Sequence, residues 1–123
     1  PDAGPALDSR AFLLSNNKPG AKELDEALLL AEQANKLRPN ETAILDTLAW
    51  VQYRRGATSE ASALMDDVLT KNPDDPGIHY HAAVIFKASG RLEEAREQVK
   101  RALQGARDFR ERTDAEALQE TLK

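Results

Sequence analysis

Hydrophobic residues recur with the period of an α-helix along most of the chain. Between residues 76 and 89 the apolar positions are spaced i, i+4, i+7 and i+8, on one helical face: Ile78, Ala82, Ile85 and Phe86. A second stripe follows and consists of Leu92, Ala95, Val99, Ala102 and Leu103. The pattern therefore predicts two consecutive helices in this part of the chain, the second from about Leu92 to Leu103.

Residues that favour helix ends flank both stripes. The side chain of Asp75 can accept hydrogen bonds from the first amides of a helix, and Pro76 suits the first helical position. Gly90 and Gly105 stand where the two stripes stop. Glycine enters the left-handed conformation that ends many helices at no steric cost, so both positions predict helix ends.

The residues before this pair repeat the same plan. We expect Asn40 to cap a helix that Gly56 ends, and Thr58 or Ser59 to cap a second helix that ends at Asn72 and Pro73. The first of these helices carries the stripe Ile44, Leu45, Leu48 and Val51. The second carries Ala61, Leu64, Met65, Val68 and Leu69.

The two ends of the chain show further helical stripes. A short one near the start comprises Leu7, Ala11 and Leu14, and a longer one over about 21–37 comprises Leu24, Ala27, Leu28, Ala31, Ala34 and Leu37. Residues 110–123 predict a terminal helix with Ala115, Leu118 and Leu122 on one face. Thr113 and Glu116 have the spacing of a capping box at its start.

A period of 34 residues relates these helix pairs. Pro39 and Pro73 are 34 positions apart, as are Gly56 and Gly90. Alanine continues the series over two such steps at Ala27, Ala61 and Ala95. The frame divides the chain into a tail 1–7, three repeats 8–41, 42–75 and 76–109, and a capping helix 110–123.

This helix–turn–helix pattern resembles the tetratricopeptide repeat (TPR). In 76–109 the residues that carry the resemblance are Ala83, Phe86, Gly90, Ala95, Ala102 and Leu103, and in 42–75 they are Leu48, Ala49, Gly56, Ala61, Val68, Leu69 and Pro73. The first repeat, 8–41, agrees less well. The resemblance implies an all-α, right-handed superhelix of three helical hairpins with a C-terminal capping helix.

A second, narrower resemblance concerns the kind of TPR protein. The segments DTLAWVQYRRG (46–56) and DDPGIHYHAAVIFKASGRLEEAR (74–96) resemble C-terminal repeats of large bacterial TPR proteins of the cell envelope, some of which accompany exopolysaccharide export. Since the sequence starts at Pro1, we expect it to be part of a longer bacterial protein. The resemblance favours the envelope over the cytoplasm as its compartment.

The TPR resemblance also implies a binding surface, because the first helix of each hairpin lines a concave groove in this family. The residues that map to this groove are Phe12, Asn16, Asp46, Trp50, Tyr53, Tyr80, Val84 and Lys87. They include the single Trp and both Tyr residues of the chain, residue types that often dominate binding energy at interfaces. The alternative is that Trp50 only fills the space between adjacent helices.

Composition narrows the function classes. Of 123 residues, 41% are hydrophobic but only six are aromatic, so alanine and aliphatic residues must form most of the core. A net charge of −4 argues against nucleic acid as the main partner, and apolar runs such as residues 27–31 are too short to span a membrane. The chain has no cysteine, which excludes disulfides and thiolate metal sites.

Neither catalysis nor a cofactor is expected from the motifs present. His79 and His81 are two residues apart, so on a helix they point about 200° apart and cannot bind one metal ion together. The paired carboxylates, such as Asp66 and Asp67, diverge on a helix for the same reason. There is no phosphate-binding loop, nucleophile elbow or dinucleotide fingerprint.

The sequence therefore favours a non-catalytic module that binds a protein segment or partner helix. Known TPR clamps for a C-terminal carboxylate need Lys, Asn and Arg, but of the residues at the matching positions, Phe12, Asn16, Thr47, Gly77 and His81, only Asn16 fits. The residues that map to the groove are apolar and aromatic with mixed charge, so an apolar segment fits better than an acidic tail. The alternative is a structural spacer or self-associating unit, with the uncapped N-terminal end as the contact surface. A third alternative, an enzyme or RNA-binding helical repeat, is disfavoured by the negative charge.

Overall fold

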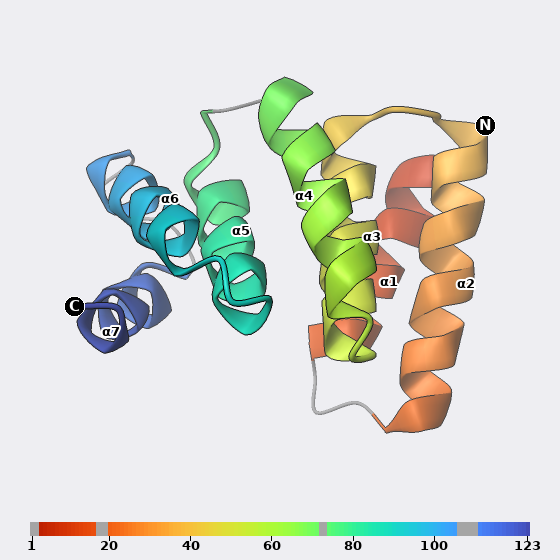
Figure 1. The fold of residues 1–123 in the computed structure, drawn as a ribbon. Helices are drawn as coiled ribbons and strands as arrows, with labels where there is room; N and C mark the ends of the chain where they lie inside the picture. Colours follow the sequence, from red (N-terminus) through yellow and green to blue (C-terminus); the bar gives the residue numbers. More distant parts are fainter. Residues whose placement is uncertain (1–2, 17–19, 72–73, 106–110) are drawn as a thin grey trace. The chain divides into compact units, whose positions relative to one another are not determined.

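Seven α-helices make up the computed structural model, which describes residues 3–16, 20–71, 74–105 and 111–123. They are α1 (Gly4–Asn16), α2 (Ala21–Leu37), α3 (Thr42–Arg54), α4 (Thr58–Lys71), α5 (Pro76–Ala88), α6 (Leu92–Gln104) and α7 (Arg112–Thr121) (Figure 1). Within these ranges there is no β-strand, so the all-α fold class is confirmed. Over the same residues, no helix combines the length and the apolar character that crossing a membrane requires.

The chain divides into two compact units, Pro1–Met65 and Asp66–Lys123, and the boundary in sequence falls within α4. In the first unit α1 and α2 pair closely, and α3 packs against both of them. Ala11, Leu30 and Ala31 form a buried cluster there, covered by Leu7, Leu14 and Leu48. Because alanine has no side chain beyond Cβ, the helix axes can approach closely at Ala11 and Ala31.

In the second unit α5 pairs with α6, and α7 packs against α6. Phe86 is only 1% exposed and is the largest of the fully buried side chains. Ile85, Ala95, Val99 and Ala102 are buried with it. Ala115 and Leu122, two of the three stripe residues predicted in the terminal helix, are buried as well.

Three of the predicted helix ends are confirmed in detail. The Asp75 carboxylate accepts hydrogen bonds from the amides of Gly77 at 2.9 Å and Ile78 at 3.2 Å, as expected of an N-cap. Gly56 and Gly90 adopt φ angles of +87° and +82° after α3 and α5. A Cβ atom would meet nothing within 4 Å at either glycine, so conformation rather than space requires glycine there.

Three predicted N-caps are wrong. Glu41, in an extended conformation, is the N-cap of α3, while Asn40 lies one residue earlier with φ +64°. Thr58 is already the first residue of α4, so neither Thr58 nor Ser59 stands before that helix. Thr113 lies inside α7, whose N-cap is Glu111 without a side-chain cap, so the predicted capping box does not form.

Other departures concern the helix termini. Helix α1 begins at Gly4, inside the residues that the repeat frame leaves as a tail. Leu37 and Leu92 belong to predicted apolar stripes but are 53% and 44% exposed, since each is the terminal residue of its helix. Gly105 ends α6 as expected, but with φ −76° rather than a left-handed conformation. Pro19, Asn72 and Pro73 lie outside the described residues.

Candidate functional site

Helix α3 carries three of the predicted groove residues, Asp46, Trp50 and Tyr53, at helical spacing i, i+4 and i+7. The ring centroids of Trp50 and Tyr53 are 5.2 Å apart and their planes are tilted by 43°. This separation is typical of interacting aromatic rings. Trp50 is only 6% exposed, whereas Tyr53 is half-buried, so Tyr53 is the accessible member of the pair.

Helix α1 is joined to α3 beside this pair. The Nε of Arg54 donates to the backbone carbonyl oxygen of Ser15 at 3.0 Å, and the Ser15 hydroxyl donates to the Phe12 carbonyl at 2.8 Å. Phe12, a predicted groove residue, is half-buried. Asn16 is the last residue of α1, but its side chain is not described. Arg54 and Ser15 are missed by the sequence analysis, since a contact across 39 positions has no periodic signal.

A group of carboxylates lies between α1 and the start of α3. Burial raises the pKa of Asp8, a hydrogen bond with Thr47 opposes that rise, and the charges of Asp46 and Glu41 add to it. The Oδ1 atom of Asp8 is buried without a hydrogen-bond partner in the described part of the chain. Asp46, the predicted groove residue, is itself 8% exposed. This part of unit Pro1–Met65 therefore concentrates negative charge.

Helix α5 carries the remaining predicted residues, Tyr80, Val84 and Lys87, again at i, i+4 and i+7. Tyr80 and Val84 are half-buried and Lys87 is exposed. The Nζ of Lys87 donates to the hydroxyl of Thr121 in α7 at 2.9 Å. Four of the eight predicted side chains thus lie in the first unit and three in the second, and the side chain of Asn16 is not described.

The two histidines belong to the core of the second unit. His79 is 4% exposed and its Nδ1 lies 2.6 Å from Oε1 of Gln98 on α6. His81 is 6% exposed and its Nε2 lies 3.5 Å from a carboxylate oxygen of Glu111. Over the residues that the structure describes, no three His, Asp or Glu side chains are grouped so that they could hold a metal ion.

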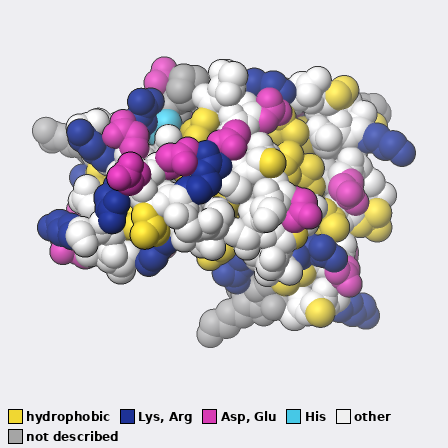
Figure 2. All heavy atoms as spheres, viewed as in Figure 1, with side chains coloured by type: hydrophobic (Ala, Val, Ile, Leu, Met, Phe, Trp, Pro, Cys, Tyr) yellow, Lys and Arg dark blue, Asp and Glu magenta, His cyan; other side chains and the backbone are white. Residues whose placement is uncertain are grey.

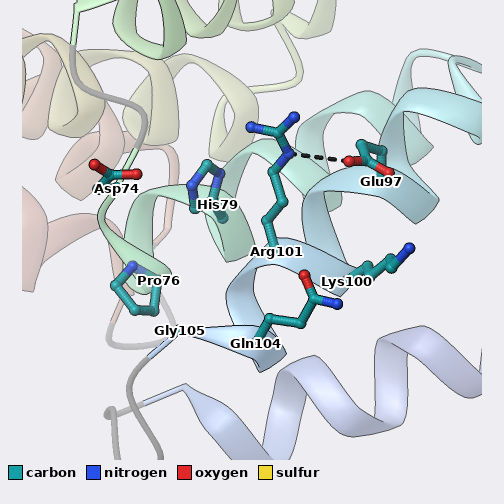
Figure 3. A pocket seen from close by; sticks show the side chains of 8 residues that line it. All are labelled: Asp74, Pro76, His79, Glu97, Lys100, Arg101, Gln104 and Gly105. Atoms are coloured by element: carbon teal, nitrogen blue, oxygen red, sulfur yellow. Dashed lines mark hydrogen bonds and ion pairs between the residues drawn. The ribbon is translucent and has the colours of Figure 1, made fainter.

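A polar cavity of about 370 Å³ lies beside His79 in the second unit. Its lining comprises Asp74, Pro76, His79, Glu97, Lys100, Arg101, Gln104 and Gly105 (Figure 3). Arg101 and Glu97 pair across one helical turn, with Nε and Oε1 3.0 Å apart. The described residues that line it include no serine or threonine.

Charges of both signs are interspersed on the face that Figure 2 shows, without one large field of a single sign. Arg91 illustrates this local pairing in the second unit. Its guanidinium contacts the carboxylate of Asp66 at 2.9 Å, pairs also with Glu94, and lies 4.1 Å from the ring centroid of Phe86. These pairs raise the pKa of Arg91 above its ordinary value, with the Glu94 hydrogen bond as the largest cause.

Comparison with known structures shows the same fold. The first TPR domain of human RPAP3 superimposes with a TM-score of 0.79 at 15% identity, covering 97% of this chain and 88% of that one. The Yersinia enterocolitica type III secretion chaperone SycD, solved in complex with a peptide of the translocator YopD, gives a TM-score of 0.76 at 17% identity. That match covers 99% of this chain and 93% of the chaperone.

Sequence comparison leads to the same family. A TPR repeat-containing protein of Pseudomonas aeruginosa, PA4667, is 32% identical over 74 residues, which are 60% of this chain. The chain spans only 12% of the length of that relative. The family model for the tetratricopeptide repeat matches residues 20–80 and 56–120, which together include most of the sequence. The chain therefore belongs to the tetratricopeptide repeat family.

Proposed function

We propose that this chain is a non-catalytic interaction module that binds a peptide or a partner helix along its first helices α1, α3 and α5. The TPR fold is suited to scaffolding contacts between proteins, and the structurally similar chaperone SycD is solved with a bound peptide. The observation that carries the proposal is the Trp50–Tyr53 pair, in which a buried ring supports an accessible one. Such a supported aromatic loses little conformational entropy when a partner covers it.

In this proposal the accessible side chains make the contacts and the buried ones position them. Tyr53, Tyr80 and Val84 supply partly exposed apolar surface, and Phe12 extends it on α1. Trp50 packs beneath Tyr53, and Asp46 and Lys87 contribute opposite charges. The occupant is therefore an apolar segment, extended or helical, that carries few charges of its own. We further propose that the functional repeats follow the boundaries 8–41, 42–75 and 76–109.

A display experiment tests this proposal without a known partner. Peptides are selected from a random library on the whole chain, and their affinities are then measured for Tyr53→Ala, Tyr80→Ala and the double variant. We expect the double variant to lose at least about tenfold in affinity, because truncating an aromatic hot spot costs 2 kcal/mol or more. Gln33→Ala, an exposed change on α2, is the matched control. Selected peptides that bind the double variant as well as the wild type would contradict the proposal.

The second candidate function is self-association through the N-terminal end. Leu13 on α1 and Leu29 on α2 are 58% and 56% exposed, the two highest values among the exposed large hydrophobic residues of the described chain. Covering these side chains with a second copy would remove their apolar surface from water, which is favourable. Light scattering over a range of concentrations tests this function. A mass that rises with concentration is expected, and a constant monomer mass would contradict it.

A further inference from the structure

A shallow groove with mostly apolar walls lies between α6 and the end of α7. Its volume is about 330 Å³ and its lining comprises Arg96, Val99, Lys100, Gln119, Leu122 and Lys123. Val99 and Leu122 are 1% and 4% exposed and provide its apolar floor. The longer side chains contribute their aliphatic stems to the walls. A further apolar group placed here would gain contacts with both helices.

The charges around this groove are of one sign. Three of its six lining residues are basic and none is acidic. Arg96 donates a hydrogen bond from Nε to the Leu122 carbonyl oxygen, and Nζ of Lys123 lies 3.0 Å from Oε1 of Glu120. Lys100 has no hydrogen bond or ion pair with any residue that the structure describes. The groove therefore favours an occupant that presents an apolar side chain flanked by carboxylates.

One exposed helix of the same chain has this pattern. On α2, the 56% exposed Leu29 has acidic residues one turn away on both sides: Asp25 at i−4, Glu26 at i−3 and Glu32 at i+3. Oδ1 of Asp25 lies 2.8 Å from Nη2 of Arg55, and Oε1 of Glu26 lies 3.0 Å from Nη2 of Arg10. Glu32, which is exposed, has no ion pair within the described residues.

The shape of the two surfaces also agrees. A groove between two helices accepts the ridge of a third, whose side chains repeat at i, i+3 and i+4. The first unit shows this arrangement, since α3 packs against both α1 and α2. Lys22 and Lys36 lie seven residues from Leu29, about 10 Å along the helix axis. Arg96 and Lys100 are one helical turn apart, so the two lysines of α2 lie farther from Leu29 than these basic residues lie from each other. The acidic residues beside Leu29 therefore face the basic groove.

We propose that α2 of one copy of this chain docks into the α6–α7 groove of a second copy. Leu29 then lies over Leu122 and the aliphatic stems of the longer lining side chains, and Glu32 lies beside Lys100. This inference rests on the second candidate function and names the surface that the N-terminal end meets. Since the two contacting surfaces differ, the contact is heterologous, and it adds copies head to tail unless the assembly closes into a ring.

The test uses the whole chain and reverses the two unpaired charges. Sedimentation velocity over a concentration series should show growing assemblies for the wild type and monomers for Leu29→Gln. Glu32→Lys and Lys100→Glu should each weaken association about tenfold, because each replaces an attraction by a repulsion. The double variant should recover it, and so should an equimolar mixture of the two single variants. Glu60→Lys, an exposed charge reversal on α4, should leave association unchanged.

The possible failures are distinguishable. A wild type that stays monomeric throughout the series overturns both self-association and this proposal. Loss of association in Leu29→Gln but not in Lys100→Glu keeps the self-association and overturns the groove as its partner surface. Failure of the mixture to recover association overturns the heterologous pairing. The peptides selected for the first proposed function should bind all these variants equally, so that function is tested separately.

Discussion

Arg54 of α3 donates a hydrogen bond from Nε to the backbone carbonyl oxygen of Ser15 near the end of α1, at 3.0 Å. The bond joins two helices that carry predicted groove residues, Phe12 on α1 and Tyr53 on α3. It therefore sets the relative position of α1 and α3 where the proposed binding surface begins.

Arg54→Ala should lower the free energy of unfolding by about 1–2 kcal/mol, because the Ser15 carbonyl loses a charged donor. Urea unfolding followed by Trp50 fluorescence measures this change, since the single Trp lies in the same unit. Arg10→Ala is the matched control. Its pair with Glu26 is well exposed, so its loss should cost less than about 1 kcal/mol. Equal effects of the two substitutions would refute a special role for the Arg54 contact.

Asp8→Asn should stabilise the protein at neutral pH by roughly 0.5–1 kcal/mol, in the range of partly screened charge interactions. The pKa of Asp8 is raised in the folded state, chiefly by burial and further by Asp46 and Glu41. The folded state therefore binds the Asp8 proton more tightly than the unfolded state, and ionisation above the folded pKa costs stability.

The sign of this effect fixes its pH dependence. Between the ordinary carboxyl pKa of 3.8 and the raised one, wild-type stability should fall as pH rises, and Asn should abolish this contribution. Urea unfolding of both proteins at pH 4 and pH 7 measures the difference. The advantage of Asn should be larger at pH 7, and an advantage confined to pH 4 would disprove the assignment.

Gly56→Ala should destabilise the protein by about 1–2 kcal/mol, the cost of the left-handed conformation for a residue with a Cβ. Gly56 has φ +87° and open space where a Cβ would stand, so a clash cannot cause the loss. Gly56→Asn should cost clearly less, because asparagine tolerates this conformation better. Thermal unfolding followed by circular dichroism compares the two, and equal losses would argue against a conformational cause.

Arg91→Ala should destabilise the second unit by about 1–2 kcal/mol, and Arg91→Lys should recover less than half of this loss. The planar guanidinium pairs with Asp66 and also stacks on Phe86, which an ammonium group cannot do equally well. Thermal unfolding followed by far-ultraviolet circular dichroism measures both variants. Full recovery by lysine would show that charge alone matters at this position.

Local sequence signals were sufficient for the helices and for several of their ends. Asp75 before Pro76 and the two glycines Gly56 and Gly90 each act through their own backbone and near neighbours, so their roles can be predicted from position. Asn40 illustrates where such signals compete. Its side chain suits an N-cap, but asparagine also tolerates a positive φ angle. In the structure Asn40 adopts φ +64°, and Glu41 is the N-cap of α3 instead.

The predicted binding residues were harder to assign from sequence. The TPR register mapped Trp50 to the groove, yet its 6% exposure places it beneath Tyr53. The carboxylate of Asp8 and the Arg54–Ser15 bond depend on contacts between α1 and α3, residues far apart in sequence, so no spacing rule reveals them. In the sequence Leu29 belongs to the apolar run 27–31, but in the structure Leu29 is 56% exposed whereas Leu30 is only 7% exposed.

A partner segment that binds beside the Trp50–Tyr53 pair should change the surroundings of the single indole N–H of Trp50. A peptide selected on the whole chain is titrated into ¹⁵N-labelled protein and followed by NMR. We predict that the indole resonance and the Tyr53 amide shift saturably, together with amides of α5 around Tyr80. An indole resonance that stays unmoved at saturation, while amides of α2, α4 or α6 shift, would contradict binding beside the Trp50–Tyr53 pair.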